Sequence, residues 1–316
     1  MKKMINKITV EGIHYENDLK KSDKGYINGK LSVLIPNEEG ITNVCDLRVI
    51  AGAKYGNKPD AKKNDNFPKF EELMNSKEKA YLKVGNEATG VSITGSLEAN
   101  YFIPRGAEPT RENVVSTVNN GASFIDIVPA SMIEKPRAEF EMDIVITSIL
   151  PEMSKDPDCP APTGNYIVKG YTFNFRNVAI EVSLIAKTCE GVASSAADYF
   201  AAMAGDLPVF TKVWGKINGF VTSIEKVEES AFGEAKVVSF KSTKKEFEIT
   251  GALATPYEDG ITEEELKNAI NAREMEIAVA MDRQKKPAAT PAASTDTVAS
   301  AFGFGSPTGG VGGFHF

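Results

Sequence analysis

The sequence predicts a mainly β protein in which one design is used twice, followed by a single helix and a low-complexity tail. Three observations support this prediction. Short segments rich in Val, Ile, Phe and Thr recur between residues 7 and 255, separated by turn residues. Each half contains a strand, a short helix-compatible segment and a strand with a glycine in its middle, Gly95 or Gly215. A helical period appears only after residue 256.

The strand predictions fall into two series separated by a proline-rich segment. The first series covers residues 7–13, 26–35, 43–52, 90–103, 122–128 and 138–150. The second covers residues 165–175, 177–188, 209–221, 235–242 and 246–254. Between them, residues 151–164 contain four prolines, which disfavour both a helix and a central strand. We therefore expect a linker there, with one domain over residues 1–150 and a second over 165–258.

A helix is predicted over residues 262–286. Thr262 and Glu265 have the spacing of a capping box. Apolar residues recur along one stripe of the helix at Leu266, Ile270, Ile277 and Met281. This stripe indicates docking on a barrel or on another subunit. The remaining residues, 287–316, are rich in Ala, Gly, Pro, Ser and Thr, a composition that predicts a disordered tail.

The charge of the chain argues against a generally basic nucleic-acid binder. The 316 residues are 42% hydrophobic and 25% charged, which is typical of a soluble globular protein, and the net charge is -7. A local basic groove can still act over a Debye length of about 10 Å. No segment approaches the ~18 apolar residues of a membrane helix, so no membrane partner is expected.

The cysteines and histidines predict neither a metal site nor a cofactor. Cys45, Cys159 and Cys189 lie far apart and form no C-x-x-C pair, so we expect reduced thiols in a cytoplasmic protein. The two histidines, His14 and His315, lie near opposite ends of the chain. Catalysis or metal binding that depends on histidine is therefore not expected.

The stretch VFTKVWGKINGFV, residues 209–221, carries an unusual pattern. Its odd-numbered positions are mostly small or aliphatic and suit the core of a small barrel. Its even-numbered positions alternate aromatic residues with lysines: Phe210, Lys212, Trp214, Lys216, Asn218 and Phe220. Exposed rings in a row need a cover, which a partner domain, the lysine stems or stacked nucleobases could provide. Stacking is worth roughly 1–3 kcal/mol per base, whatever the base.

Lysines surround this aromatic stripe. Residues 209–223 and 235–245 contain no acidic residue and carry six lysines: Lys212, Lys216, Lys236, Lys241, Lys244 and Lys245. The segment between them has four glutamates and predicts a hairpin loop turned to water. Two adjacent acid-free strands would form a positive groove that binds phosphates. The alternative is that these lysines form the solvated face of an antiparallel sheet.

The first half offers a weaker candidate site. The strand that corresponds to residues 209–221 turns Ser92, Thr94, Ser96 and Glu98 outward, so it is polar but not basic. The basic residues of this half lie instead in the loop KYGNKPDAKKNDNFPK, where Tyr55, Lys58, Lys62 and Lys63 are candidates for contacting a nucleic-acid strand. A solvated loop is the alternative. We therefore expect the second half to bind more strongly.

Two segments carry a resemblance to a known family. EVSLIAKTCEGVASSAADYFAAMAG, followed by VWGKINGFV, resembles the centre of single-stranded DNA-binding proteins of the bacterial and phage type, and VSITGSL matches the same strand in the first half. The resemblance implies two small OB-like barrels in tandem, each able to bind an extended strand. It implies sequence-independent, non-catalytic binding in DNA replication, recombination and repair. RNA as a ligand and association into a homo-oligomer stay open.

The end of the chain departs from that family. The family's tail ends in an acidic tip with a terminal phenylalanine, and the tip recruits replication or recombination proteins. This chain ends in GGVGGFHF, which keeps Phe314 and Phe316 but lacks the acids. Recruitment of the usual partners is therefore in doubt. Two barrels in one chain also resemble a phage-encoded protein more than the common one-barrel form.

Two other classes of function compete with this interpretation. A β-rich structural protein of a virion or tail would use the exposed rings as subunit contacts. An enzyme would need a catalytic pair, and the pairs Glu139/Glu141 and Glu246/Glu248 are candidates only by their spacing. That spacing puts both carboxylates on one solvated strand face, and no nucleophile and base accompany them. We therefore expect no enzymatic activity.

Overall fold

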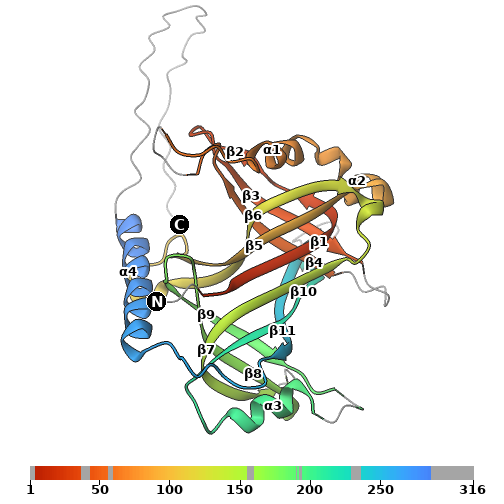
Figure 1. Ribbon diagram of the computed structural model, residues 1–316. Helices are drawn as coiled ribbons and strands as arrows, with labels where there is room; N and C mark the ends of the chain where they lie inside the picture. The colour runs from red at the N-terminus through yellow and green to blue at the C-terminus, as the bar shows by residue number, and fades with distance from the viewer. Residues whose placement is uncertain are drawn as a thin grey trace, which may run out of the picture.

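The structure, a computed structural model, describes residues 4–36, 43–55, 60–154, 160–189, 191, 194–228 and 236–285. For residues 86, 221–228, 236–244 and 284–285 it describes the backbone alone. The chain forms two β-rich bodies, and helix α4 stands beside them (Figure 1). The predicted tail, residues 287–316, lies outside the described residues.

The first body is a closed circuit of five strands. In chain order they are β1 (Asn6–Asn17), β3 (Ile27–Ile35), β4 (Asn43–Ala51), β5 (Thr89–Phe102) and β6 (Val115–Pro129). β1 pairs with β3, β3 with β4, β4 with β6, β6 with β5, and β5 returns to β1. The β4–β6 pair is parallel and the others are antiparallel. The short strand β2 (Lys20–Lys21) pairs with Ile27 and Asn28 at the start of β3.

The second body repeats the same circuit. Its strands are β7 (Arg137–Met153), β8 (Pro162–Phe173), β9 (Ala179–Ala186), β10 (Val209–Glu228) and β11 (Lys236–Ala252). β7 pairs with β8, β8 with β9, β9 in parallel with β11, β11 with β10, and β10 returns to β7. Five strands closed in this order form the small Greek-key barrel of the OB-fold. The prediction of a mainly β fold with two OB-like barrels in tandem is confirmed.

The internal repeat is confirmed in its details. Helices α1 (Phe67–Asn75) and α2 (Tyr81–Val84) connect β4 to β5, and α3 (Ala196–Met203) connects β9 to β10. The two mid-strand glycines occupy matching places, because the register shifts at Gly95 in β5 and at Gly215 in β10. Four single 3-10 turns complete the described elements: η1 (Lys77–Lys79), η2 (Gly85–Glu87), η3 (Arg111–Asn113) and η4 (Ala130–Met132).

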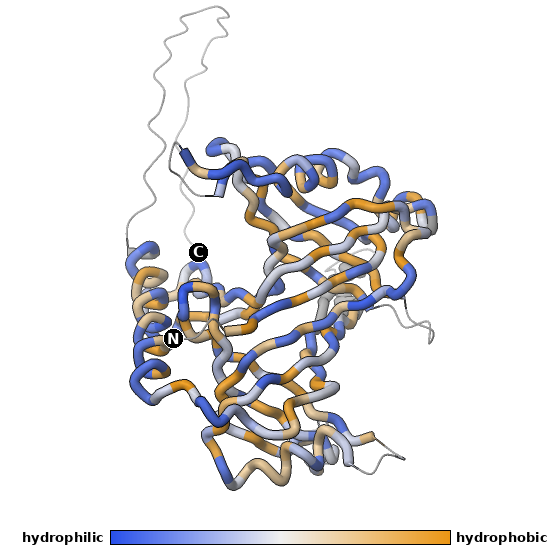
Figure 2. Tube along the Cα trace, viewed as in Figure 1, coloured by the Kyte–Doolittle hydropathy of each residue, from blue (hydrophilic) through white to orange (hydrophobic). Residues whose placement is uncertain are grey.

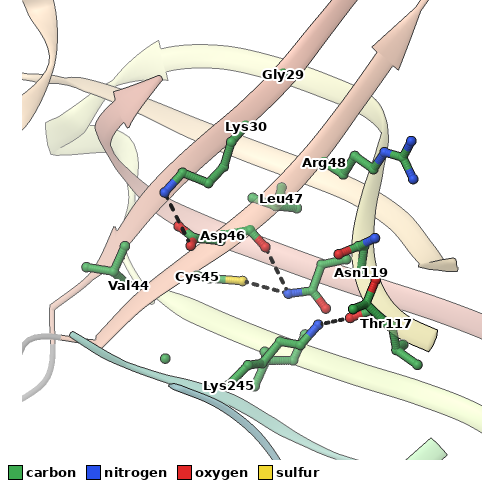
Figure 3. Close-up of a pocket in the computed structure, with 14 residues that line it drawn as sticks. Gly29, Lys30, Val44, Cys45, Asp46, Leu47, Arg48, Thr117, Asn119 and Lys245 are labelled. Atoms are coloured by element: carbon green, nitrogen blue, oxygen red, sulfur yellow. Dashed lines mark hydrogen bonds and ion pairs between the residues drawn. The ribbon is translucent and has the colours of Figure 1, made fainter. Parts of the chain in front are cut away.

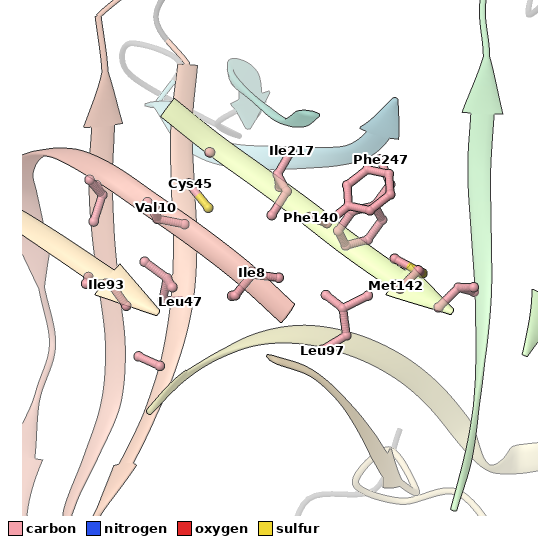
Figure 4. Close-up of a cluster of buried hydrophobic side chains, with 14 of the residues drawn as sticks. Ile8, Val10, Cys45, Leu47, Ile93, Leu97, Phe140, Met142, Ile217 and Phe247 are labelled. Carbon is pink, nitrogen blue, oxygen red and sulfur yellow. The ribbon is translucent and has the colours of Figure 1, made fainter. Parts of the chain in front are cut away.

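One hydrophobic core runs through both circuits. Hydrophobic and hydrophilic residues alternate along the strands, as Figure 2 shows, so each strand turns one face inward. Ile8 and Leu97 of the first circuit belong to the same buried cluster as Phe140 and Phe247 of the second (Figure 4). Phe140 and Phe247 pack edge to face with their ring centroids 5.7 Å apart. The two barrels are therefore packed together.

The proline-rich segment, predicted as a linker between two domains, lies within the second circuit. Pro151 of β7 pairs with Tyr166 of β8, and Met153 pairs with Pro162, so this segment forms the connection between two paired strands. Residues 155–159 of it lie outside the described residues. Irregular register next to Pro151 accommodates the missing N–H. The second circuit therefore begins with β7 at Arg137, before the expected boundary at residue 150. The strands predicted at 235–242 and 246–254 form the single strand β11.

Helix α4 (Glu263–Lys285) braces the two circuits from outside. The predicted capping box is present, since the Glu265 backbone N–H donates to Thr262 Oγ1 at 3.2 Å and the Thr262 N–H donates to Glu265 Oε2 at 3.1 Å. Arg273 lies 2.7 Å from Glu181 of β9, and Glu274 pairs with Arg111 of the first body at 3.1 Å. The apolar stripe of α4 docks on the chain's own barrels, which is one of the two partners expected from the sequence.

The described residues contain no evident metal group or membrane helix. Cys45 is a buried free thiol and Cys189 is exposed, while Cys159 lies outside the described residues. Within the described ranges no cluster of three or more His, Cys, Asp or Glu side chains could hold a metal ion. None of the helices in those ranges is long and apolar enough to cross a membrane.

The bulge glycines generate a stability prediction. A Cβ added to Gly95 would lie 1.7 Å from the carbonyl oxygen of Gly121, so Gly95→Ala must push β5 away from β6. We expect a loss of about 2–3 kcal/mol in the free energy of unfolding, measured by urea denaturation. Gly260→Ala is the matched control, because nothing lies within 4 Å of its added Cβ. A Gly95 variant as stable as that control would contradict the close packing at the bulge.

Candidate nucleic-acid interface

Strand β10 presents the aromatic stripe on its outer face, as the sequence predicts. It lies between β7 and β11 in the second circuit. Its odd-numbered residues Thr211, Val213 and Ile217 are at most 1% exposed, while Trp214 and Lys216 are exposed. The period of two in the sequence therefore identifies the inner and outer faces of this strand correctly.

Phe210 is covered by the chain itself. Its ring packs on Tyr257 with centroids 4.9 Å apart, and the Tyr257 N–H donates to the Phe210 carbonyl oxygen at 3.0 Å. The Tyr257 hydroxyl donates to Asp143 Oδ1 at 2.9 Å, and burial together with this carboxylate raises the pKa of Tyr257 to about 12. The segment before α4 thus fixes Phe210 in place, and this ring is not open to a nucleobase.

Trp214 is the exposed aromatic residue in the middle of the stripe. Its side chain is 39% exposed and lies against Gly251 of β11, where an added Cβ would come within 2.4 Å of the indole ring. Glycine at position 251 therefore leaves the space that the indole occupies. The indole lines an open groove of about 680 Å³, whose other walls include Thr9 of β1, Thr94 of β5 and Arg137 of β7. This groove, which we call the Trp214 groove, crosses both circuits.

The Trp214 groove is not positively charged, because its lining carries three cations and three carboxylates. The positive groove expected along residues 209–223 and 235–245 stays a prediction, since the side chains of Lys236, Lys241 and Lys244 lie outside the described residues. Lys212 Nζ lies 2.9 Å from Glu141 Oε1 of β7, which stands on the neighbouring strand. Arg137 donates two hydrogen bonds to Glu11, at 2.9 and 3.3 Å. The acid-free segments pair with strands that carry glutamates, which the charge pattern of the segments alone does not reveal. Lys216 makes no ion pair with any described residue.

The second glutamate pair, on β11, shares one lysine, Lys187, which directly follows β9. Lys187 Nζ lies 2.9 Å from Glu246 Oε1 and 2.6 Å from Glu248 Oε2. Glu248 also accepts a hydrogen bond from Asn218 at 2.9 Å. These carboxylates therefore have structural partners on the outer face.

Lys245 does not share the outer face. It pairs in register with Gly219, an odd-numbered position of β10, and its amine donates to the carbonyl oxygen of Val118 in the first circuit. Lys245 therefore lies apart from Lys212 and Lys216, because neighbouring residues on a strand alternate in direction.

The remaining predicted residues are dispersed. Phe220 is 37% exposed and pairs with Asn43 at the start of β4. Tyr55 follows the other end of β4, which lies about 25 Å from Asn43 at ~3.3 Å per residue. The Tyr55 hydroxyl accepts a hydrogen bond from Asn66 Nδ2 at 3.3 Å. Lys62 and Lys63 are exposed in the same loop. The side chains of Lys236, Lys241 and Lys244 lie outside the described residues, as do Lys58, Phe314 and Phe316 entirely.

A pair of cations on the first circuit was missed in the sequence. Lys30 of β3 and Arg48 of β4 stand directly opposite each other. In the OB-fold the second and third strands, here β3 and β4, form the face that binds oligonucleotides. The sequence signal for this pair was a single cation near the middle of each of two largely apolar strands, β3 and β4. Only their register, which the sequence leaves open, reveals that the two cations face each other.

The comparisons with known proteins give a family and two similar structures. The family model described as YorF matches residues 4–283, and the chain therefore belongs to the YorF family. The wild-type single-stranded DNA-binding protein from Thermus aquaticus is similar at 13% identity and a TM-score of 0.43, covering 83% of this chain and 97% of its own. A deletion mutant of that protein is similar at 14% identity and a TM-score of 0.42, covering 83% of this chain and 100% of its own. No curated protein matches the chain.

The two ends of the aromatic stripe should differ in their contribution to stability. Phe210→Ala removes a ring packed on Tyr257, and we expect a loss of roughly 2 kcal/mol, about half of the cost for a fully buried ring. Phe220→Ala removes a more exposed ring and should cost less than about 1 kcal/mol. Thermal denaturation of both variants measures the difference. Equal losses would show that Phe210 is not the better-packed ring.

Proposed function

We propose that this YorF-family protein binds single-stranded DNA without regard to sequence, as a non-catalytic protein of replication, recombination or repair. The observation that carries the proposal is the exposed indole of Trp214, lying against Gly251 in a groove that crosses two OB-like barrels. Such a groove has room for an extended strand, and OB-like barrels are a common scaffold for this kind of ligand.

The position of Trp214 suits base stacking. The indole is held against β11, so little side-chain entropy is lost when a base covers its open surface. Every base has a π-face, and stacking on an aromatic ring therefore does not select a sequence. A double helix has no free base faces to offer, so the same surface should prefer single strands.

Lys216 supplies the charge beside that ring. It lies two residues from Trp214 on the same face, about 7 Å along the strand. Its amine is exposed and has no carboxylate partner among the described residues, whereas Lys212 is held by Glu141. A phosphate between stacked bases can therefore pair with Lys216 without breaking an existing ion pair.

Trp214 provides the direct test, because it is the chain's single tryptophan. Addition of single-stranded oligothymidylate should quench its emission strongly, and duplex DNA of equal length should quench it far less. Trp214→Ala should weaken binding by roughly 1–3 kcal/mol, and Trp214→Phe should recover part of that loss, since a smaller ring still stacks. Fluorescence titration and filter binding measure these quantities.

The competing account makes Trp214 a contact between protein subunits. It predicts that DNA leaves the emission of Trp214 unchanged and that Trp214→Ala alters the mass of the protein in solution, measured by sedimentation equilibrium. That pair of results would refute the stacking role of Trp214.

Lys216 should contribute to the salt dependence of binding. Removing one lysine–phosphate interaction with a single strand lowers the slope of log K against log salt by roughly 0.7. We expect this change for Lys216→Ala and a smaller one for Lys212→Ala, which serves as the control because Glu141 already neutralises Lys212. Identical slopes for the wild type and Lys216→Ala would place this lysine away from the bound strand.

A further inference from the structure

A cavity of about 450 Å³ lies where the two circuits meet (Figure 3). Strands β3, β4 and β6 of the first circuit supply most of its lining, and Ile217, Gly219 and Lys245 of the second circuit supply the rest. The close approach of β10 to β4 makes this wall, since an added Cβ on Gly219 would lie 1.8 Å from the Val44 carbonyl oxygen. We call this the inter-circuit cavity. Its volume is within the ordinary range for a small-molecule site, roughly 300–1,000 Å³.

The lining of the inter-circuit cavity is positively charged in an acidic protein. Lys30, Arg48 and Lys245 contribute three cations, and Asp46 contributes the one carboxylate. The whole chain has a net charge of -7, so this local excess is opposite in sign to the average. A concave site with a cationic lining attracts anions.

Two of these cations, Lys30 and Arg48, lie next to each other although like charges repel. Lys30 and Arg48 are directly opposite on β3 and β4, and like charges in that position are destabilising. Asp46 and Glu16 compensate Lys30, with carboxylate oxygens 3.5 and 4.0 Å from its amine. Asp46 also accepts a hydrogen bond from Ser32 at 2.6 Å. Arg48 donates to the neutral amide oxygen of Asn100 at 3.3 Å and makes no ion pair with a described carboxylate. Arg48 is thus the cation of the pair that has no direct ion pair with a described carboxylate.

Glu98 lies near Arg48 and interacts with it electrostatically, but the two side chains form no direct ion pair. It is close enough for Arg48 to favour its ionised form, yet burial has the larger effect and raises the pKa of Glu98. It is not among the residues that line the cavity. The guanidinium of Arg48 therefore keeps hydrogen-bonding capacity for a ligand in the cavity.

Lys245 is the third cation and comes from the second circuit. Its amine donates to the Val118 carbonyl oxygen and lies 4.9 Å from the centre of the Phe247 ring. Burial lowers the pKa of Lys245 to about 8, and the nearby Asp46 offsets this loss of water only in part. A buried ammonium group is costly unless it is paired. An anion in the cavity would supply that missing partner.

We propose that the inter-circuit cavity is a phosphate site in which Arg48 of the first circuit and Lys245 of the second hold one phosphate group, while Lys30 adds positive charge to the lining. The planar guanidinium of Arg48 can donate two parallel hydrogen bonds to phosphate oxygens, and the lysines act as point charges. The phosphate belongs either to a bound DNA strand or to a free nucleotide. The first source rests on the proposed function, and the second does not.

The first arm of the test uses small ligands on the full chain. Inorganic phosphate and thymidine monophosphate are titrated by calorimetry into the wild type, Lys245→Met and Arg48→Gln, with circular dichroism to confirm folding. Lys187→Met is the control, because Lys187 is a half-buried lysine whose partners, Glu246 and Glu248, lie outside the cavity. For a free nucleotide we expect binding at least about tenfold weaker in both cavity variants and unchanged in the control.

The second arm uses single-stranded oligothymidylate. If the phosphate belongs to the strand, Lys245→Met and Arg48→Gln should each lower the salt slope of binding by roughly 0.7, while quenching of Trp214 at saturation persists. Unchanged affinities of both cavity variants, for the small ligands and for the strand alike, would overturn the phosphate site. A protein that binds no single-stranded DNA but still binds thymidine monophosphate in this way would refute the proposed function and support the phosphate site.

Discussion

The antiparallel pairing of β1 with β7 is the interaction on which the rest of this structure depends. Six residue pairs, from Asn6 with Met142 to Glu11 with Arg137, join the first strand of one circuit to the first strand of the other. The side-chain amide of Asn6 reinforces the junction, because it donates to the carbonyl oxygens of Leu97 and Phe173, one in each circuit. Without this ladder, the described strand pairing between the two barrels would be the single pair Phe220–Asn43.

Both candidate binding surfaces follow from that junction. The Trp214 groove has residues of β1 and β5 on one side and of β7, β10 and β11 on the other, so it exists only while the circuits are paired. The inter-circuit cavity likewise needs β10 and β11 to lie over β4 and β6. Two barrels in one chain therefore share their surfaces, and a ligand on either surface contacts both.

Local features of the fold could be predicted from the sequence. The alternation along residues 209–221 identified the buried face of β10, and the spacing of Thr262 and Glu265 identified the start of α4. The matching glycines at positions 95 and 215 revealed the repeat, because a register shift in the fourth strand of each circuit requires a residue without a side chain. Each of these signals acts over a few residues.

Long-range register could not be predicted in the same way. Sequence pattern placed residues 138–150 in the first half, although β7 closes the second circuit, because nothing local shows which partner a strand selects. The acid-free segments suggested a positive groove, but Glu141 beside Lys212 comes from a strand about 70 residues away. The opposition of Lys30 and Arg48 depends on register in the same way.

The central claim is that β1 and β7 make the two circuits one structural unit. Native-state hydrogen exchange at increasing urea, read by mass spectrometry, tests it most directly. The account predicts that peptides covering Val91–Leu97 in the first circuit and Val182–Ala186 in the second exchange through one common opening, with the free energy of global unfolding. Exchange of one circuit at a clearly lower free energy, while the other stays protected, would contradict it.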